Sequence, residues 1–427
     1  MTSFTAAVYQ NEFLADGSTD VHAIVTVECS GAGQAGQSGG GGAAELVLID
    51  TSGSMGHEGV RAAQEAANAA LDQVVEGTWF AVIAGSHVAR LVYPTDVREG
   101  AMTRMDRRTR EEARRAIATL APDGGTAMGT WLELAARVAT SVPGVTQRHA
   151  ILLTDGKNQH ESPQELDARL RSAIGVFQCD CRGVGAAWEV GEVRRIAQAL
   201  MGTVDLIPRP DQMAAEFASL MRAAMSRGVA AADLRVWAPQ GAQVLFVRQV
   251  SPSVEDLTPR RREVNPLTGA YPTGSWGDES RDFHVAVRLP ASRAVGQEQL
   301  AARVQLVVGD EVTAQGLVKA QWSDNSELTA QINPEVAHYT GQAELAQVIQ
   351  DGLAARAMGD ERTATAKLGR AAQLAAQTGN EEATSKLRRV VEIDEPATGK
   401  VRLKKDVAKL DEMALDTAST KTTRVRK

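Results

Sequence analysis

The stretch Glu45–Gly56, ELVLIDTSGSMG, sets the strongest limit on the fold of this 427-residue chain. Four consecutive apolar residues, Leu46–Ile49, run directly into an acid. A short, continuous apolar run of this kind is typical of a strand that is covered on both faces in a parallel sheet. Gly53 and Gly56 allow the chain to turn sharply after the strand. The stretch therefore predicts a central strand of an α/β domain.

Three oxygen-bearing side chains follow that strand at alternate positions, namely Asp50, Ser52 and Ser54. They would lie at the carboxyl end of a parallel strand, where open α/β sheets bind ligands. Hard oxygen donors suit Mg²⁺ or another oxygen-loving divalent cation. Because Asp and Ser are also common in turns and as helix N-caps, the stretch alone leaves a metal site and a capped turn both open.

The pattern between residues 45 and 226 alternates between strands and helices. Strands are expected at 45–50, 78–85, 87–94, 149–158, 174–183 and 203–207, and helices at 57–76, 104–120, 129–141, 163–173, 189–200 and 211–226. The strands at 78–85 and 87–94 are interpreted as a hairpin. Alternating units of this kind predict an α/β domain with a doubly wound, mainly parallel sheet.

The segments on either side of this domain read as short strands and turns. Two strands are expected within residues 1–29, and five more, punctuated by Pro and Gly, within residues 229–322. A series of short strands separated by turns is typical of an antiparallel β-sandwich. The N-terminal strands are expected to join it, which makes the α/β domain an insertion. Residues 30–44 have the composition of a flexible glycine-rich linker.

The 94 residues from 334 to 427 divide into a helical part and a tail. Residues 334–391 are rich in Ala, Leu and Gln and carry three apolar stripes, which predict a three-helix hairpin array. Residues 392–427 have few large apolar side chains and are predicted to be disordered. From residue 400 onward this tail holds nine Lys and Arg against four Asp and Glu, so it is locally basic.

Composition excludes several classes of function. The net charge of −7 is mild, so it indicates no nucleic acid partner. Three cysteines, an odd number, argue against a disulfide framework, and Cys179 and Cys181 are interpreted as small core residues. No window approaches the roughly 20 apolar residues of a membrane span, and the N-terminus lacks the features of a signal peptide. A cytoplasmic location without membrane insertion is predicted.

Two further loops strengthen the metal hypothesis. Thr126 lies in an Asp-Gly-Gly-Thr loop between two expected helices, and Asp155 ends the strand HAILLT. All three loops leave a doubly wound sheet at the same edge. Five side chains are therefore expected to meet in space: Asp50, Ser52, Ser54, Thr126 and Asp155.

These residues resemble the metal-ion-dependent adhesion site of the von Willebrand factor A domain family. The family motif D-x-S-x-S is present as Asp50-Thr51-Ser52-Gly53-Ser54, its threonine matches Thr126, and its distal aspartate matches Asp155. All five positions occur in family order within residues 45–225. The overall layout is similar to bacterial, intracellular, multidomain members whose A domain is inserted in a β-sandwich.

The resemblance implies a binding function rather than catalysis. In this family the two serines and the threonine commonly touch the ion, while the aspartates often act through water and supply charge. The ion implied is Mg²⁺, or alternatively Mn²⁺ or Ca²⁺, and its open position attracts a carboxylate from a partner protein. The leading hypothesis is a metal-dependent scaffold that is not an enzyme.

Two alternatives remain. Ser52 and Ser54 lack the G-x-S-x-G context of a nucleophile, and His57 and His160, expected on the same rim, are more often simply solvated. A magnesium-dependent hydrolase usually needs more carboxylates than two. Because family members also serve ATPase machines, the main alternative is an accessory subunit of an ATPase or metal chelatase complex. This chain contains no P-loop, so the ATPase would be a separate protein.

The C-terminal end provides a second candidate site. Thr422-Thr423-Arg424-Val425 resembles the phosphothreonine motif that forkhead-associated domains read, and preceding basic residues resemble Ser/Thr kinase sites. A phosphate would add roughly −1.5 to −2 charge to the tail. The candidate phosphorylation sites are Thr417, Thr420, Thr422 and Thr423. The partners implied are a Ser/Thr kinase and a forkhead-associated-domain protein; a solvated cationic tail that binds acidic surfaces is the alternative.

Overall fold

The computed structural model describes residues 2–33, 42–95, 102–290 and 295–424. These residues form two compact units. The first comprises Gly31–Ala230 and Gly274–Gly277, and the second contains the other described residues. Residues 34–41 of the predicted linker lie outside the described part of the chain, and Ala43 and Ala44, at the linker's end, already belong to the first strand of the α/β sheet.

The first unit is built on one sheet, as predicted. Its strands are β4 (Ala43–Asp50), β5 (Trp79–Gly85), β6 (Ala89–Tyr93), β7 (Thr103–Arg104), β8 (Gln147–Thr154), β9 (Gln178–Val184) and β10 (Val204–Ile207). Along the sheet they run β10-β9-β8-β4-β5-β6, with β7 also paired to β5. The five strands from β10 to β5 are parallel, while β5 and β6 form the expected antiparallel hairpin.

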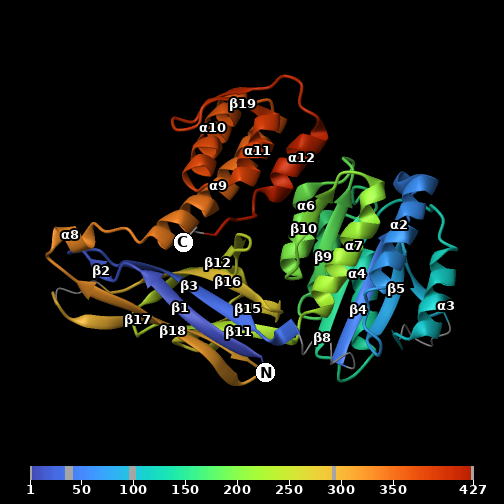
Figure 1. Ribbon diagram of the computed structural model, residues 1–427, viewed down its shortest axis with the longest axis horizontal. Coiled ribbons are helices and arrows are strands. Elements are labelled where there is room, and N and C mark those ends of the chain that lie inside the picture. The colour runs from blue at the N-terminus through green and yellow to red at the C-terminus, as the bar shows by residue number, and fades with distance from the viewer. Residues whose placement is uncertain (1, 34–41, 96–101, 291–294, 425–427) are drawn as a thin grey trace. The chain divides into compact units, whose positions relative to one another are not determined.

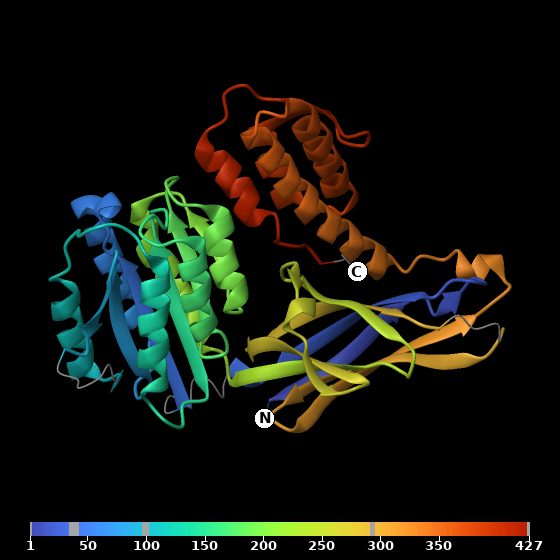
Figure 2. The ribbon, with the colours of Figure 1, turned by 180° about the vertical axis from the view of Figure 1, so that it is seen from behind.

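Helices cover both faces of this sheet (Figure 1), as the view from behind in Figure 2 also shows. They are α2 (Gly56–Leu71), α3 (Arg107–Ile117), α4 (Met128–Thr140), α5 (Pro163–Ala173), α6 (Val190–Ala199) and α7 (Met213–Met225). Val47 and Ile49 pack in one core with α2, α3 and α7. The intervening residues Leu46 and Leu48 are equally inaccessible on the opposite face. The central strand is therefore buried on both sides, as its apolar run predicted.

A charged cluster lies inside this sheet. His149 of β8 is buried between two carboxylates, with Nδ1 2.7 Å from Glu45 Oε2 and Nε2 2.9 Å from Asp180 Oδ2. Burial opposes protonation of the imidazole, but the charges and hydrogen bonds of Glu45 and Asp180 outweigh burial and raise the pKa of His149 to about 9. The cluster therefore joins β4, β8 and β9 through a charged histidine.

This cluster makes the stability of the α/β domain sensitive to alkaline pH. Because the pKa of His149 is higher in the folded protein than the value of about 6.5 in an unfolded chain, its contribution is complete below pH 6.5 and is lost as the pH rises through about 9. The shift corresponds to roughly 3 kcal/mol. We expect the deficit of a His149→Gln variant, measured by urea unfolding against the unchanged chain, to shrink by that amount between pH 6 and pH 9.5. An equal deficit at both pH values would contradict this assignment.

Most of the predicted antiparallel β-sandwich belongs to the second unit. One sheet runs β1 (Ser3–Gln10), β3 (Asp20–Ser30), β16 (Glu279–Arg288), β12 (Gln243–Ser251) and β13 (Glu255–Asp256). The other runs β14 (Arg262–Asn265), β15 (Thr268–Trp276), β11 (Val229–Trp237), β17 (Glu298–Val308), β18 (Glu311–Trp322) and β2 (Phe13–Leu14). The N-terminal strands β1 and β3 join the sandwich, which confirms the insertion of the α/β domain. The strand β15 was not expected, because its proline and glycines are turn signals.

The C-terminal part begins with the short helix α8 (Ser326–Thr329) and contains the three predicted helices, α9 (Pro334–Ala357), α10 (Glu361–Gln377) and α11 (Glu381–Val390). The prediction that 392–427 is disordered is wrong for the residues described. They form β19 (Val391–Glu395), β20 (Lys400–Leu403) and α12 (Lys409–Ala418). The tail has few apolar side chains, but Val401 and Leu415 insert into the core of the preceding helices and so need no core of their own.

The last described residues, Thr420–Arg424, bind back to the sandwich, and we call them the C-terminal strap. Thr422 donates its hydroxyl to the Val250 carbonyl (2.7 Å) and its amide to the Pro252 carbonyl (3.1 Å). Arg424 donates to Ser280 Oγ (2.6 Å) and pairs with Asp282. These hydrogen bonds and the ion pair hold the strap against the β-sandwich.

Throughout the described residues, every helix is too short or too polar to cross a lipid bilayer.

Candidate metal centre

The five predicted metal residues gather at the carboxyl edge of the α/β sheet. Asp50 ends β4 and Asp155 follows β8, while Ser52 and Ser54 lie in the turn from β4 into α2. Thr126 belongs to the loop between α3 and α4. The three loops hold one another through the backbone, since Gly53 N donates to Gly124 O (2.8 Å) and His160 N donates to Thr126 O (3.0 Å).

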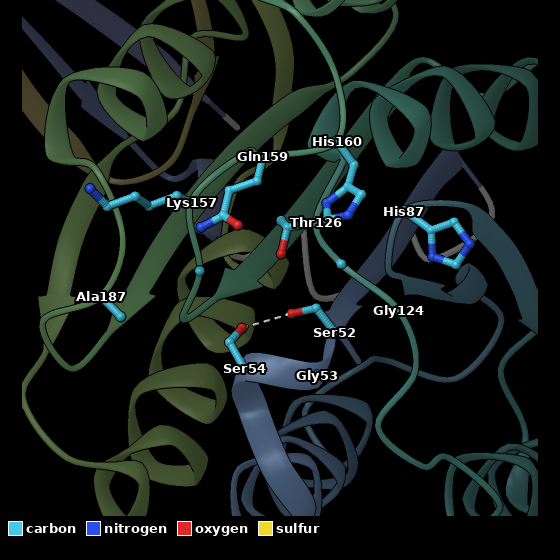
Figure 3. A pocket seen from close by; sticks show the side chains of 12 residues that line it. Ser52, Gly53, Ser54, His87, Gly124, Thr126, Lys157, Gln159, His160 and Ala187 are labelled. Carbon is cyan, nitrogen blue, oxygen red and sulfur yellow. Dashed lines mark hydrogen bonds between the residues drawn. The ribbon is translucent and has the colours of Figure 1, made fainter.

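The three hydroxyl groups converge on one small space. Ser52 Oγ and Ser54 Oγ are 3.0 Å apart. A Cβ added to Gly156 would lie 3.0 Å from both Ser54 Oγ and Thr126 Oγ1 and 3.9 Å from Ser52 Oγ. The space between these hydroxyls therefore stays open because residue 156 is glycine. Figure 3 shows Ser52, Ser54 and Thr126 pointing into the same cavity.

The two aspartates accept hydrogen bonds from the two serines of the site. Asp50 is fully buried; Oδ1 accepts from the Ser52 amide and Oδ2 from the Thr154 hydroxyl, both at 2.7 Å. Asp155 Oδ1 accepts from Ser54 Oγ at 2.7 Å. Burial raises the pKa of Asp50 although its hydrogen bonds oppose this shift. Burial also raises the pKa of Asp155 to about 6, against the Ser54 hydrogen bond and with the help of the Asp50 charge.

This arrangement suits a hard cation. A nearby positive charge stabilises the charged form of a buried or half-buried carboxylate, as Asp50 and Asp155 are. Hydroxyl and carboxylate oxygens are the donors that Mg²⁺ and Ca²⁺ prefer. Within the described ranges, no group of three or more His, Cys, Asp or Glu side chains gathers around a possible ion, so a site here depends on the hydroxyls.

The hydroxyls form part of a cavity of about 570 Å³. Its other lining residues are Gly53, His87, Gly124, Gly125, Gly156, Lys157, Gln159, His160 and Ala187. His160 lies on the rim as predicted, whereas His57 is an exposed residue of α2 that does not line the cavity. Sequence reasoning missed His87. A signal was available, since His87 lies two residues after the end of β5, the strand beside β4, and so lies at the same edge.

The four tail threonines lie in packed structure rather than in a disordered segment. Thr417 is 1% exposed and donates to the Met413 carbonyl (2.9 Å), so a kinase has no access to its hydroxyl in this fold. Thr420 is partly buried, the Thr422 hydroxyl donates to Val250, and Thr423 Oγ1 accepts from Gln342 (2.9 Å). Position 425, the valine of the proposed phosphothreonine motif, lies outside the described residues. Phosphorylation of the tail stays a prediction.

Known proteins share both the sequence pattern and the fold. Residues 46–200 match the von Willebrand factor type A domain, and residues 373–419 match the von Willebrand factor type A C-terminal domain. A von Willebrand factor type A protein from Catenulispora acidiphila is 45% identical, with a TM-score of 0.93 over 99% of this chain and 97% of that one. The ArnB paralog VWA2 from Sulfolobus acidocaldarius is 14% identical and shares the fold, with a TM-score of 0.56 over 98% of both chains.

An uncharacterized protein of Synechocystis sp. is 28% identical over 268 residues, which cover 60% of this chain and 60% of the relative. The chain thus spans about 60% of the length of that curated relative. The similarity to the Catenulispora protein, at 45% identity, extends over nearly the whole of both chains. The chain therefore belongs to the von Willebrand factor type A family.

Proposed function

We propose that the chain is a metal-dependent protein-binding module. Ser52, Ser54 and Thr126 would hold Mg²⁺, or Mn²⁺ or Ca²⁺, directly, with Asp50 and Asp155 supplying negative charge from behind. The observation that carries the proposal is the convergence of the three hydroxyls on the space beside Gly156, at the surface of an open cavity.

The donor set explains why such a site would bind an acid. The two carboxylates offset the charge of one divalent cation. The three hydroxyls are neutral, so they reduce its positive charge little further. An ion held in this way keeps an affinity for a further anionic oxygen. A glutamate or aspartate of a partner protein supplies such an oxygen, and its charge adds specificity to the contact. The function supported is therefore the binding of an acidic residue through a metal.

A hydrolytic function receives less support from the same residues. Ser52 and Ser54 hydrogen-bond to each other, and Ser54 also donates to Asp155. Among the described hydrogen bonds, no imidazole accepts a proton from either serine. A nucleophilic serine is usually activated by an adjacent base that is itself held in place by a third group. We therefore propose that the chain is not an enzyme.

Removal of a buried aspartate tests the proposal. Asp50→Ala is expected to lower the affinity for Mn²⁺ or Mg²⁺, measured by isothermal titration calorimetry, by about tenfold to a hundredfold, because Asp50 orients Ser52 and supplies charge. Asp123→Ala, an exposed aspartate three residues before Thr126 that does not line the cavity, is the matched control and should bind metal like the unchanged chain. Retention of a partner from native extract should likewise require Mg²⁺ and fail with EDTA. Equal metal binding by both variants would refute the proposal.

Gly156→Ala tests the convergence of the hydroxyls without removing any of them. Its methyl group would lie 3.0 Å from Ser54 Oγ and Thr126 Oγ1, so it competes with the cation for the same space. We expect a loss of metal affinity of at least about tenfold, with a change in unfolding free energy of about 1 kcal/mol. Gly191→Ala in α6 meets no atom within 4 Å and serves as the control. Unchanged metal affinity in Gly156→Ala would place the ion elsewhere.

The finer predictions are tested by the same partner capture. An ATPase among the Mg²⁺-dependent partners would favour the alternative of an accessory subunit in a chelatase-type complex. A Ser/Thr kinase or a forkhead-associated-domain protein would favour the signalling role, and mass spectrometry of Thr420, Thr422 and Thr423 would establish phosphorylation. The cytoplasmic location predicted from composition also stays a prediction.

A further inference from the structure

The cavity around the hydroxyls is larger than one carboxylate requires. At about 570 Å³ it has room for several side chains of a bound peptide. Three exposed polar residues contribute to its wall, namely His87, Gln159 and His160. Their side chains make no hydrogen bond with any residue that the structure describes, so their donors and acceptors remain available to a ligand. Lys157, by contrast, is already paired with Glu189.

The two imidazoles are placed by the glycines of the Thr126 loop. An added Cβ on Gly124 would lie 2.0 Å from the ring of His87, and one on Gly125 would lie 1.8 Å from the ring of His160. Each ring therefore lies directly against loop backbone, where only glycine leaves space. The ring centroids are 6.2 Å apart with a tilt of 51°, and both rings border the same side of the cavity (Figure 3).

We propose that His87 and His160, together with Gln159, form a second recognition point beside the metal. This inference rests on the proposed function. The recognition point would select an acidic peptide in which the metal-binding Asp or Glu is flanked by a second oxygen-bearing side chain. The hydroxyls and the ion take the first carboxylate, and the imidazole and amide N–H groups donate to the second oxygen. Wall residues thus determine which acidic partners are bound, while the metal determines that an acid is required.

A displayed peptide library tests this assignment. Each peptide carries one fixed aspartate with four random residues on either side, and selection is carried out on the full chain with Mg²⁺ or with EDTA. We expect Mg²⁺-dependent enrichment of Asp, Glu, Ser or Thr at a constant offset from the fixed aspartate. The double variant His87→Ala/His160→Ala should keep the need for Mg²⁺ and the fixed aspartate but lose the offset preference. Its affinity for a selected peptide should fall by about tenfold.

Two further variants separate recognition from general disruption. Gly125→Ala keeps both imidazoles but pushes the His160 ring out of place, so it should also weaken the selected peptide. His57→Ala removes an exposed histidine that does not line the cavity and should change nothing. Mn²⁺ affinity, measured on His87→Ala/His160→Ala and on His57→Ala, should remain that of the unchanged chain.

The outcomes distinguish the two proposals. If the double variant selects the same sequences with the same affinity, the recognition point is refuted while the metal-dependent binding stands. If enrichment is the same with EDTA, or with Asp50→Ala, the metal-dependent function itself fails. If His87→Ala/His160→Ala loses Mn²⁺ binding, the imidazoles belong to the metal site and the separate recognition point is refuted.

Discussion

Replacing His149 by alanine is expected to destabilise the α/β domain by about 3–5 kcal/mol, because it leaves Glu45 and Asp180 as buried carboxylates without their shared cation. Asp180 keeps other partners, since it accepts from the amide and hydroxyl of Thr203 at 2.7 and 2.6 Å and lies 3.8 Å from Arg227. Glu45 depends on His149 more strongly, because its Oε1 has no hydrogen-bond partner among the described residues.

A double variant isolates the cause of this loss. Glu45→Leu together with His149→Leu removes the dependent carboxylate and the histidine at once, so we expect it to be less destabilised than His149→Ala alone. The measurement is the free energy of opening from hydrogen exchange of the β4, β8 and β9 amides, followed by mass spectrometry. His57→Ala, on the exposed surface of α2, is the control and should stay within about 0.5 kcal/mol. A double variant that is destabilised as much as His149→Ala, or more, would show that the unpaired Glu45 carboxylate is not the cause of the loss.

Removing the C-terminal strap by ending the chain at Ser419 is expected to destabilise the second unit by about 3 kcal/mol. The strap bonds to β12 and the residues after it, where Val254 N also donates to Thr420 O (2.7 Å), and to α9, where Gln342 donates to Thr423. Each such hydrogen bond contributes about 0.5–1.5 kcal/mol. Buried Asp282 would in addition lose Arg424, although it keeps the hydroxyls of Thr26 and Tyr339.

Hydrogen exchange locates the effect of this truncation. Protection should fall at the end of β12 and in the first turns of α9, while the strands of the α/β sheet keep theirs. Thr422→Val, which keeps the side-chain shape and removes only the hydroxyl bond to Val250, should reproduce about 1 kcal/mol of the loss. Arg402→Ala, whose ion pairs are exposed, is the control. Undiminished protection in α9 would mean that the strap does not hold that helix.

Most of the fold was predictable because it depends on local periodicity. The helices and strands of the α/β domain carry apolar residues at the spacing of one covered face or, in β4, of two. β15 was missed because its packing overrides the turn signals of Pro272 and its glycines. The C-terminal hairpin and α12 were missed for a related reason. Their few apolar side chains fill gaps in a core that other helices provide, which a count of apolar residues along the tail does not reveal.

In the candidate metal site, too, some features follow from the sequence and others only from the tertiary structure. The sequence by itself determined which five residues lie at the ligand edge, since strand order and motif spacing require the three loops to meet there. Only the tertiary structure decided that the hydroxyls face the space beside Gly156 while Asp50 lies beneath them. It also decided that His87 joins His160 on the wall. The physical reason is that local sequence specifies how a segment folds, whereas the neighbours of a side chain depend on how separate segments pack.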